Sequence, residues 1–248
     1  RLDPTTSPME TLNLILPKSW QELSPDQLRY VFFLLSEGCS PAELKTYALF
    51  RWAPLQDVQK TDIGVFCRYA GKEYHLTSLQ LAEVLTALSW LEQLPAVPVR
   101  LSSIGKAQAV EADLTGITFE SFLILENLYQ GYLVTKDDTL LDEMATVLYP
   151  SLKPKTLLPE ERIGVFYWYA TAKQSIAKTY THFFVTSDVP PSTTGMQERL
   201  QQAMNNQIRA LTKGDITKEA LVLKMDVHRA LVELDAQARE YEELKKIK

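Results

Sequence analysis

The sequence has 248 residues, of which 46% are hydrophobic and 23% are charged, and its formal net charge is -5. This composition is typical of a globular chain that forms one large domain or two smaller ones. The negative charge, without a cluster of lysines and arginines, argues against a nucleic-acid binder, because neutralising phosphates needs such clusters.

Other protein classes are disfavoured by shorter patterns. The apolar runs, such as YVFFLL and FLIL, fall short of the about 18 residues that span a bilayer, so we expect no membrane protein. No signal-peptide pattern opens the chain. Cys39 and Cys67 alone do not make a disulfide framework, and we expect two reduced thiols in a cytosolic protein. Arg1–Pro8 precede the first methionine and are set aside as an extension.

The first half of the chain predicts a strand followed by two helices. The apolar stretch Leu12–Leu16 indicates a short strand. Ser24 and Ser40 are each followed by proline, which is the pattern of an N-cap with proline in the first helical turn. Gly38 stands where a left-handed residue would end the first helix. Two antiparallel helices are therefore expected.

A change of period follows these helices. In IGVFCRYAGKEYHLT, which begins at Ile63, alternate residues are apolar and AGK supplies a turn, so we expect a β-hairpin. Thr77 is placed to cap a helix whose apolar face is spaced at helical intervals and which ends at Pro95. The residues of that face are Leu81, Val84, Leu85, Leu88 and Leu91.

The second half predicts a similar order of elements. VRLSSIGKAQAVEADL indicates a strand, a glycine turn and a strand. Thr118 is placed to cap a helix, DDTLLDEMATVLYP predicts a second helix that ends at Pro150, and a long helix is expected from about Pro159.

An eight-residue motif occurs twice. IGVFCRYA at Ile63–Ala70 and IGVFYWYA at Ile163–Ala170 share six identities. The helix pairs before each copy are offset by nearly the same interval, which suggests an internal duplication of a helix-helix unit. The first copy nevertheless predicts strand and the second predicts helix, so a chance similarity of aromatic runs stays open as the alternative.

A linker and two further helices are expected after the second motif. TSDVPPSTTG at Thr186–Gly195 is polar and contains a proline pair. Beyond it lie MQERLQQAMNNQIRAL and, from about Thr217, a helix that runs to the C-terminus. An apolar stripe follows this last helix, whose charges nearly balance. The stripe consists of Val227, Leu231, Leu234, Ala238, Tyr241 and Leu244.

These patterns predict a mainly α protein with a small antiparallel β component, an α+β fold. We divide the chain into the extension (1–8), a first helical unit with the hairpin (9–103), a second helical unit (104–187), and a linker with C-terminal amphipathic helices (188–248).

No catalytic, cofactor or metal site is predicted. His75, His182 and His228 lie in separate elements and lack the spacing of a helical metal site. Cys67 and His75 could face each other as a nucleophile and its base, but a core thiol beside a surface imidazole is the simpler interpretation. The carboxylates near Asp137, Asp138, Asp142 and Glu143 are interpreted as a helix N-terminus followed by a solvated face.

A protein-binding role is suggested by two apolar features. The aromatic residues of FYWYA and YTHFF exceed what one core-facing stripe usually hides, so they indicate either a partner surface or packing between the two units. The stripe of the last helix must also be covered, by its own domain, a second copy or another protein. The predicted partner-binding residues are Val227, Leu231, Leu234, Tyr241, Leu244, Tyr167 and Trp168.

Three stretches carry a family resemblance: LPKSWQELSPDQLRYVFFLLSEG, ENLYQGYL and LKMDVHRALVELDAQAREYEE. They resemble uncharacterised proteins encoded in temperate phages and prophages of gut Bacteroidetes, over most of Met9–Lys248. The resemblance implies a phage morphogenesis setting, such as that of tail genes. It supplies no catalytic residues to transfer.

The sequence therefore predicts a non-enzymatic structural or assembly protein of a phage or prophage, either a virion component or a tail-assembly chaperone. Its expected location is the host cytoplasm or the virion, and its expected partner is a protein or a second copy. The alternative is a regulatory or adaptor protein that binds through its C-terminal helices. An enzymatic function would rest on Cys67 and His75.

Overall fold

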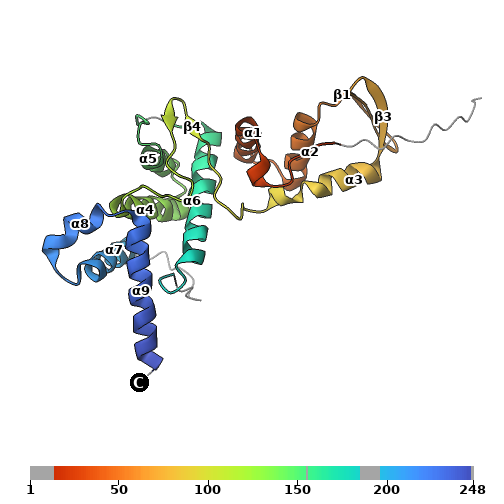
Figure 1. The fold of residues 1–248 in the computed structure, drawn as a ribbon. Helices are drawn as coiled ribbons and strands as arrows, with labels where there is room; N and C mark the ends of the chain where they lie inside the picture. Colours follow the sequence, from red (N-terminus) through yellow and green to blue (C-terminus); the bar gives the residue numbers. More distant parts are fainter. Residues whose placement is uncertain (1–13, 155, 185–195, 247–248) are drawn as a thin grey trace, which may run out of the picture. The chain divides into compact units, whose positions relative to one another are not determined.

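The computed structural model describes residues 14–154, 156–184 and 196–246. The chain divides into two compact units, residues 1–94 and 95–248. Both are built mainly from helices with a small antiparallel β component, which confirms the predicted fold class (Figure 1). The predicted extension at residues 1–8 and the predicted linker at 186–195 lie outside the described residues.

The first unit begins with a pair of capped helices. α1 spans Pro25–Ser36 and α2 spans Pro41–Trp52. Ser24 and Ser40 each form a capping box, in which the serine side chain accepts a backbone N–H of the first turn. Gly38, with φ +72°, follows α1 as expected. The described residues before Trp20, including Leu14–Leu16, form no strand.

A three-stranded antiparallel sheet follows this helix pair. It consists of β1 (Gln56–Thr61), β2 (Gly64–Tyr69) and β3 (Lys72–Thr77), in the order β1-β2-β3. The β2–β3 hairpin confirms the prediction. β1 was not predicted, because its sequence QDVQKT is polar on both faces and shows no alternation.

The first unit is closed by a contact between its two ends. α3 spans Ser78–Ala87 and continues as a 3-10 turn, η2 (Ser89–Glu92), so the expected helix is shorter and changes type. Trp20, in the 3-10 turn η1 (Trp20–Glu22), donates its indole N–H to the carbonyls of Trp90 and Gln93 at 3.2 and 3.0 Å. These bonds hold η1 against η2.

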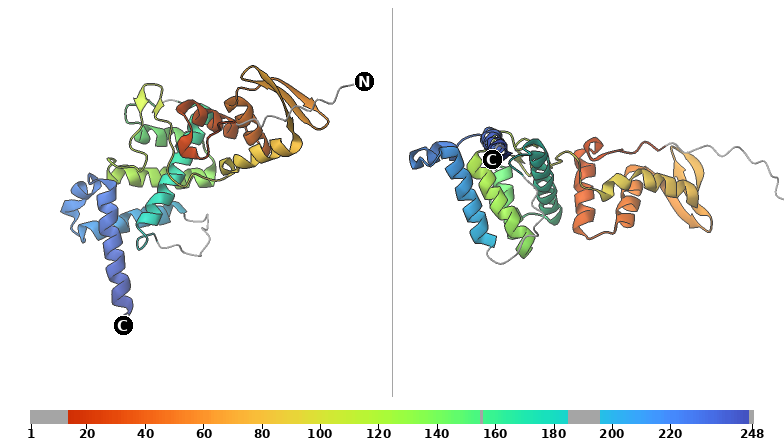
Figure 2. Two further views of the ribbon diagram at one scale, coloured as in Figure 1. Left: turned by 45° about the vertical axis from the view of Figure 1, so that its right-hand side comes forward. Right: turned by 90° about the horizontal axis from the view of Figure 1, so that it is seen from below.

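The second unit contains a two-stranded hairpin and six α-helices among its described residues (Figure 2). The hairpin and the first three helices agree with the predicted order. The elements are β4 (Ser103–Ile104), β5 (Ala107–Gln108), α4 (Phe119–Thr135), α5 (Thr139–Leu148), α6 (Pro159–Thr179), α7 (Met196–Thr212), η3 (Ile216–Lys218), α8 (Glu219–Leu223) and α9 (Val227–Lys246).

The core of the second unit is formed by α4, α5, α6 and α9. Each contributes an apolar face that is almost completely buried. Two buried aromatic side chains of this core have hydrogen-bond partners for their polar groups. Trp168 donates its indole N–H to the Ala112 carbonyl at 2.7 Å, and Tyr149 donates its hydroxyl to the Leu101 carbonyl at 2.9 Å. The core helices of this unit thus come from both sides of the predicted linker.

The domain boundaries differ from those expected. The first unit ends at Leu94 rather than at residue 103, because Ile104 is buried in the core of the second unit and the Leu101 carbonyl accepts the Tyr149 hydroxyl. The C-terminal helices were expected to follow a linker as an extension. They belong to the second unit, since α9 supplies four buried residues to its core.

The expected continuous helix from Thr217 is interrupted between α8 and α9. The Met225 carbonyl accepts the Phe119 N–H at 2.8 Å, and the Val227 N–H donates to the Ile117 carbonyl at 3.1 Å. These backbone groups are therefore unavailable for helical hydrogen bonds. Asp226 then begins α9, because its side chain accepts the His228 and Arg229 backbone N–H groups.

The two IGVF motifs adopt different secondary structures. In the first unit the motif enters β2 at Gly64, and in the second it lies within α6. The motif is therefore not a repeated structural element, as the contrast between its flanking sequences already suggested. A Cβ atom at Gly64 would lie 2.0 Å from the Leu76 carbonyl oxygen, so this position of the sheet requires glycine.

We expect Gly64→Ala to lower the free energy of unfolding of the first unit by about 2 kcal/mol, because backbone atoms of β3 must move. Gly71→Ala is the control: Gly71 also has positive φ, +80°, but nothing lies within 4 Å of its Cβ position, so a loss of about 1 kcal/mol is expected. Denaturant unfolding followed by tryptophan fluorescence measures the difference. Equal losses would contradict the steric argument.

Candidate functional site

Cys67 and His75 do not form a catalytic pair. In the β2–β3 ladder Cys67 lies opposite Tyr74, and His75 lies opposite Phe66. Directly paired residues share a face of the sheet and neighbours alternate, so the thiol and the imidazole lie on opposite faces. Cys67 is 3% exposed, and burial raises the pKa of its thiol. The alternative interpretation of Cys67 as a core thiol is therefore the one that the structure supports.

The carboxylates near the start of α5 mainly serve to hold α6. Arg162 donates from Nε and Nη2 to the two carboxylate oxygens of Asp142, at 2.9 and 2.7 Å, and from Nη1 to Asp138 at 3.1 Å. Asp137 accepts the Thr139 N–H at 3.0 Å and so starts the helix. The predicted solvated face is thus partly an ion-pair network between two helices.

The two histidines of the second unit make hydrogen-bond contacts that support α9. His228 is hydrogen-bonded through Nδ1 to the Tyr180 hydroxyl at 3.0 Å and through Nε2 to the Asp113 carbonyl at 2.9 Å. His182 lies 3.1 Å from Glu242. No group of three potential metal ligands occurs in the described part of the chain.

The aromatic stretch predicted as a partner surface mostly belongs to the core. Trp168 and Tyr169 are fully buried, Tyr167 is half-buried, and Phe166 packs against Tyr129 with ring centroids 5.8 Å apart. Trp168 packs against Tyr149, and Tyr169 bonds to Glu126 of α4. This packing lies within the second unit, whereas the expected alternative was packing between the two units. Burial raises the pKa of Tyr167.

A polar network lies beside this aromatic packing. Glu126 of α4 accepts the Tyr169 hydroxyl at 2.8 Å and pairs with Lys173 at 2.5 Å. Burial, reinforced by the Glu126 charge, raises the pKa of Tyr169 well above its usual value, so its hydroxyl stays protonated and donates to that carboxylate. The cluster fastens α4 to α6 and satisfies the buried hydroxyl.

The apolar stripe of α9 is divided between core and surface. Val227, Leu231 and Leu234 are at most 4% exposed, whereas Tyr241 is 60% and Leu244 is 63% exposed. The first three therefore offer no free surface in the folded unit. Of the seven predicted partner-binding residues, Tyr241 and Leu244 are the two that are largely accessible.

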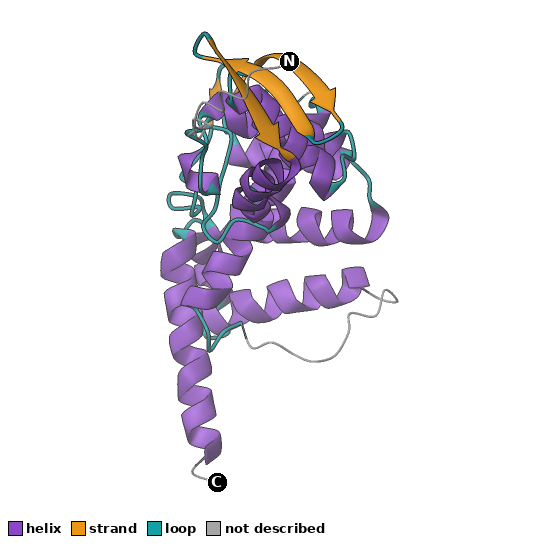
Figure 3. Cartoon of the chain, turned by 90° about the vertical axis from the view of Figure 1, so that its right-hand side faces the viewer, coloured by secondary structure: helices purple, strands orange, loops and turns teal. Residues whose placement is uncertain are grey.

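Polar contacts hold the first part of α9 in place. Asp235 accepts the backbone N–H groups of His182 and Phe183 at 2.8 and 3.0 Å, which ties α9 to the turn after α6. Together with the His228 and His182 contacts, these bonds fix the direction of the helix. The His182 contact reaches as far as Glu242, and α9 continues past the other helices of its unit to Lys246 (Figure 3). We call residues 238–246 the α9 tip.

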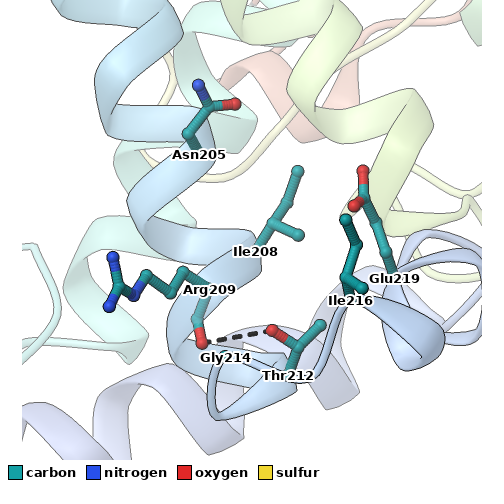
Figure 4. Close-up of a pocket in the computed structure, with 7 residues that line it drawn as sticks. All are labelled: Asn205, Ile208, Arg209, Thr212, Gly214, Ile216 and Glu219. Carbon is teal, nitrogen blue, oxygen red and sulfur yellow. Dashed lines mark hydrogen bonds between the residues drawn. The ribbon is translucent and has the colours of Figure 1, made fainter.

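A second accessible surface was not predicted. A concavity of about 330 Å³ lies between the end of α7 and the segment of η3 and α8. In Figure 4 Ile208 and Ile216 extend into it from opposite sides, Glu219 stands at its rim, and the Arg209 guanidinium points away. Ile216 is 79% exposed, and Leu221 in α8 is 72% exposed. We call Ile208, Ile216 and Glu219 the α8 surface.

The sequence contained only a weak signal for the α8 surface. Ile216 directly follows KGD, a turn signal, and a large apolar residue is unusual there. The hollow also needs α8 to end before α9 begins, and that break is held by backbone bonds to a segment more than one hundred residues away. The sequence predicted a continuous helix from Thr217, and such a helix gives no reason to single out Ile216.

In the first unit, a concavity of about 430 Å³ lies along β1 and β2. Arg68 extends beside it and pairs with Asp57 at 2.7 Å and with Glu73 at 3.5 Å. Because two carboxylates already engage this arginine, the arrangement does not provide a free cationic site.

Comparisons with known proteins give no family assignment. No family model, no curated protein and no solved structure matches this chain. Among the described helices, none combines the length and apolar character needed to cross a bilayer.

The division of the α9 stripe predicts that two leucine substitutions differ in how much stability they cost. Leu234→Ala should lower the free energy of unfolding of the second unit by about 3 kcal/mol, because it leaves a cavity in the core. Leu244→Ala should cost less than about 0.5 kcal/mol, because its side chain is already in water. Unfolding followed by circular dichroism tests this, and similar losses at both positions would contradict the assigned burial.

The Arg162 network predicts a pH-dependent contribution to stability. Burial alone would raise the pKa of Asp142, but hydrogen bonds from Arg162 and the Leu157 N–H, together with the Arg162 charge, outweigh it, so the pKa is lowered. The Asp142 carboxylate therefore contributes fully to the free energy of unfolding above its unfolded-state pKa of about 4. This contribution is lost as the pH falls through the lower folded-state pKa.

We expect Asp142→Asn to cost about 1 to 2 kcal/mol at neutral pH and progressively less as the pH falls below about 4. The exposed neighbour Glu143→Gln serves as the control and should change stability little at neutral or acid pH. Denaturant unfolding across this pH range measures both variants. A loss at Asp142 that does not diminish in acid would show that the charge is not its cause.

Proposed function

We propose that this protein is a non-enzymatic structural or assembly protein that binds a protein partner through the α9 tip. One observation carries the proposal: α9 is anchored in the core by Val227, Leu231 and Leu234, and then extends Tyr241 and Leu244 into solvent on the same stripe. Apolar side chains aligned at helical spacing and held on a rigid support are typical of a helix-mediated protein interface.

We further propose a temperate phage or prophage as the setting. The support is the resemblance of three stretches of the sequence to uncharacterised phage and prophage proteins. Within that setting the protein would be a virion component or a tail-assembly chaperone, located in the host cytoplasm or in the particle. The alternative, a regulatory or adaptor protein, would use the same α9 tip on a partner outside the virion.

Mass spectrometry of purified particles and of lysates from producing cells separates these roles. A virion component is expected in the particles, whereas a chaperone is expected in the lysate, bound to a particle protein, but absent from the particles. Recovery only with a partner that belongs to no particle would overturn the assembly role in favour of the adaptor.

The α9 tip itself is tested by matched substitutions. Leu244→Glu should weaken binding of the recovered partner by about tenfold or more, because a charge replaces an apolar contact. Val232→Glu is the control, since Val232 is 57% exposed and lies on another face of α9, about 120° around the helix from Leu244. Equal binding by both variants and the natural chain would place the interface elsewhere.

A further inference from the structure

The exposed apolar residues of the α9 tip lie on one face of the helix. Tyr241 and Leu244 are 60% and 63% exposed. At about 100° per residue they are about 60° apart around the helix axis, so one occupant contacts both side chains. We call these two residues the tip face.

The two edges of the tip face carry opposite charges. Glu240 lies about 70° to one side of its centre, and Lys245 lies about 70° to the other side. Both side chains are exposed. The Lys245 ammonium lies 4.6 Å from the centre of the Tyr241 ring, which places it at the edge of this face. Glu233, two turns earlier in α9, lies on the same side as Glu240.

The other charged side chains of the described tip lie away from the tip face. They are about 130° or more from its centre around the helix, and they are Arg239, Glu242, Glu243 and Lys246. Glu242 is also engaged with His182 at 3.1 Å. An occupant of the tip face therefore meets one acidic edge and one basic edge, and it does not meet these four groups.

A second copy does not match the tip face in an antiparallel orientation. When two identical helices pair antiparallel, the two-fold symmetry places each edge beside the same edge of the other copy. The Glu240 edges would then face each other, and so would the Lys245 edges. Like charges beside each other oppose this pairing.

A parallel orientation of two copies is blocked by the second unit itself. Opposite edges would meet in a parallel pair, but the partner helix would have to run back along the same side of α9. Ala230 and Leu234 lie on that side, and they are 0% and 4% exposed because other parts of the unit cover them. In Figures 1 and 2 the last turns of α9 extend beyond the other helices of the unit.

We propose that the tip face binds a helix of a different protein whose edges carry the reverse charges. Its apolar side chains would contact Tyr241 and Leu244, a lysine or arginine would lie beside Glu240, and an aspartate or glutamate would lie beside Lys245. The same edges select against pairing of this protein with its own copies. This inference rests on the proposed function and specifies the chemistry of the partner.

A charge-reversed variant of the protein supplies such a helix for the test. The double variant Glu240→Lys with Lys245→Glu keeps the tip face and exchanges its two edges. In an antiparallel pair with the natural chain, each edge then lies beside an edge of opposite charge. We expect the natural chain and the variant to be monomeric alone and to form a 1:1 complex when mixed.

Nuclear magnetic resonance of the isotope-labelled natural chain measures this binding through the amide signals of the α9 tip. The unlabelled charge-reversed variant should shift these signals at concentrations at least about tenfold lower than the unlabelled natural chain does. The matched control is Glu243→Lys with Lys246→Glu, which reverses two charges away from the tip face and should act like the natural chain. Circular dichroism checks that both variants are folded.

Two results would overturn the inference. If the charge-reversed variant causes no shift, the edges do not select the partner, and if the natural chain causes the same shift, the occupant is a second copy. The proposed function fails separately, when the recovered partner binds the Leu244→Glu variant as tightly as the natural chain. A partner that is weakened by Leu244→Glu but not by the charge-reversed variant contradicts this inference alone.

Discussion

The second unit depends on a short backbone joint between two segments that are far apart in the sequence. Phe119 donates to the Met225 carbonyl, Val227 donates to the Ile117 carbonyl, and the Asp226 carboxylate accepts the Gly116 N–H at 3.0 Å. α4 and α9 both begin at this joint. Because Asp226 also caps α9, one residue ends the preceding segment, starts the last helix and ties it to the unit.

The joint determines which part of α9 is core and which part is surface. From Val227 onward the helix crosses the apolar faces of the unit, and the polar contacts of His228 and Asp235 fix its direction. The packed helices end before α9 does. The same apolar stripe therefore stabilises the unit at its start and is available for binding at its tip, which links the stability of the fold to the proposed assembly role.

The paired IGVF motifs show how far local sequence can mislead. Gly64 enters a strand because a hairpin partner, β3, lies beside it. The position requires glycine because a side chain there would collide with the backbone of Leu76. In the second copy no turn follows, and Pro159 with the acidic residues after it starts a helix instead. The identical residues of the two motifs supply aromatic and apolar side chains in both cases, while the flanking residues decide the backbone conformation.

The sequence by itself determined the elements whose signals are local. Ser24, Ser40, Thr77 and Thr118 cap helices where expected, because a cap acts within one turn of its own residue. The tertiary structure alone decided the burial of Leu234, the exposure of Leu244, the separation of Cys67 from His75 and the break before α9. The first, second and last of these depend on contacts between distant segments, and the Cys67–His75 relation depends on strand register. Helical or alternating periodicity identifies an apolar face but does not specify where the packing partner ends.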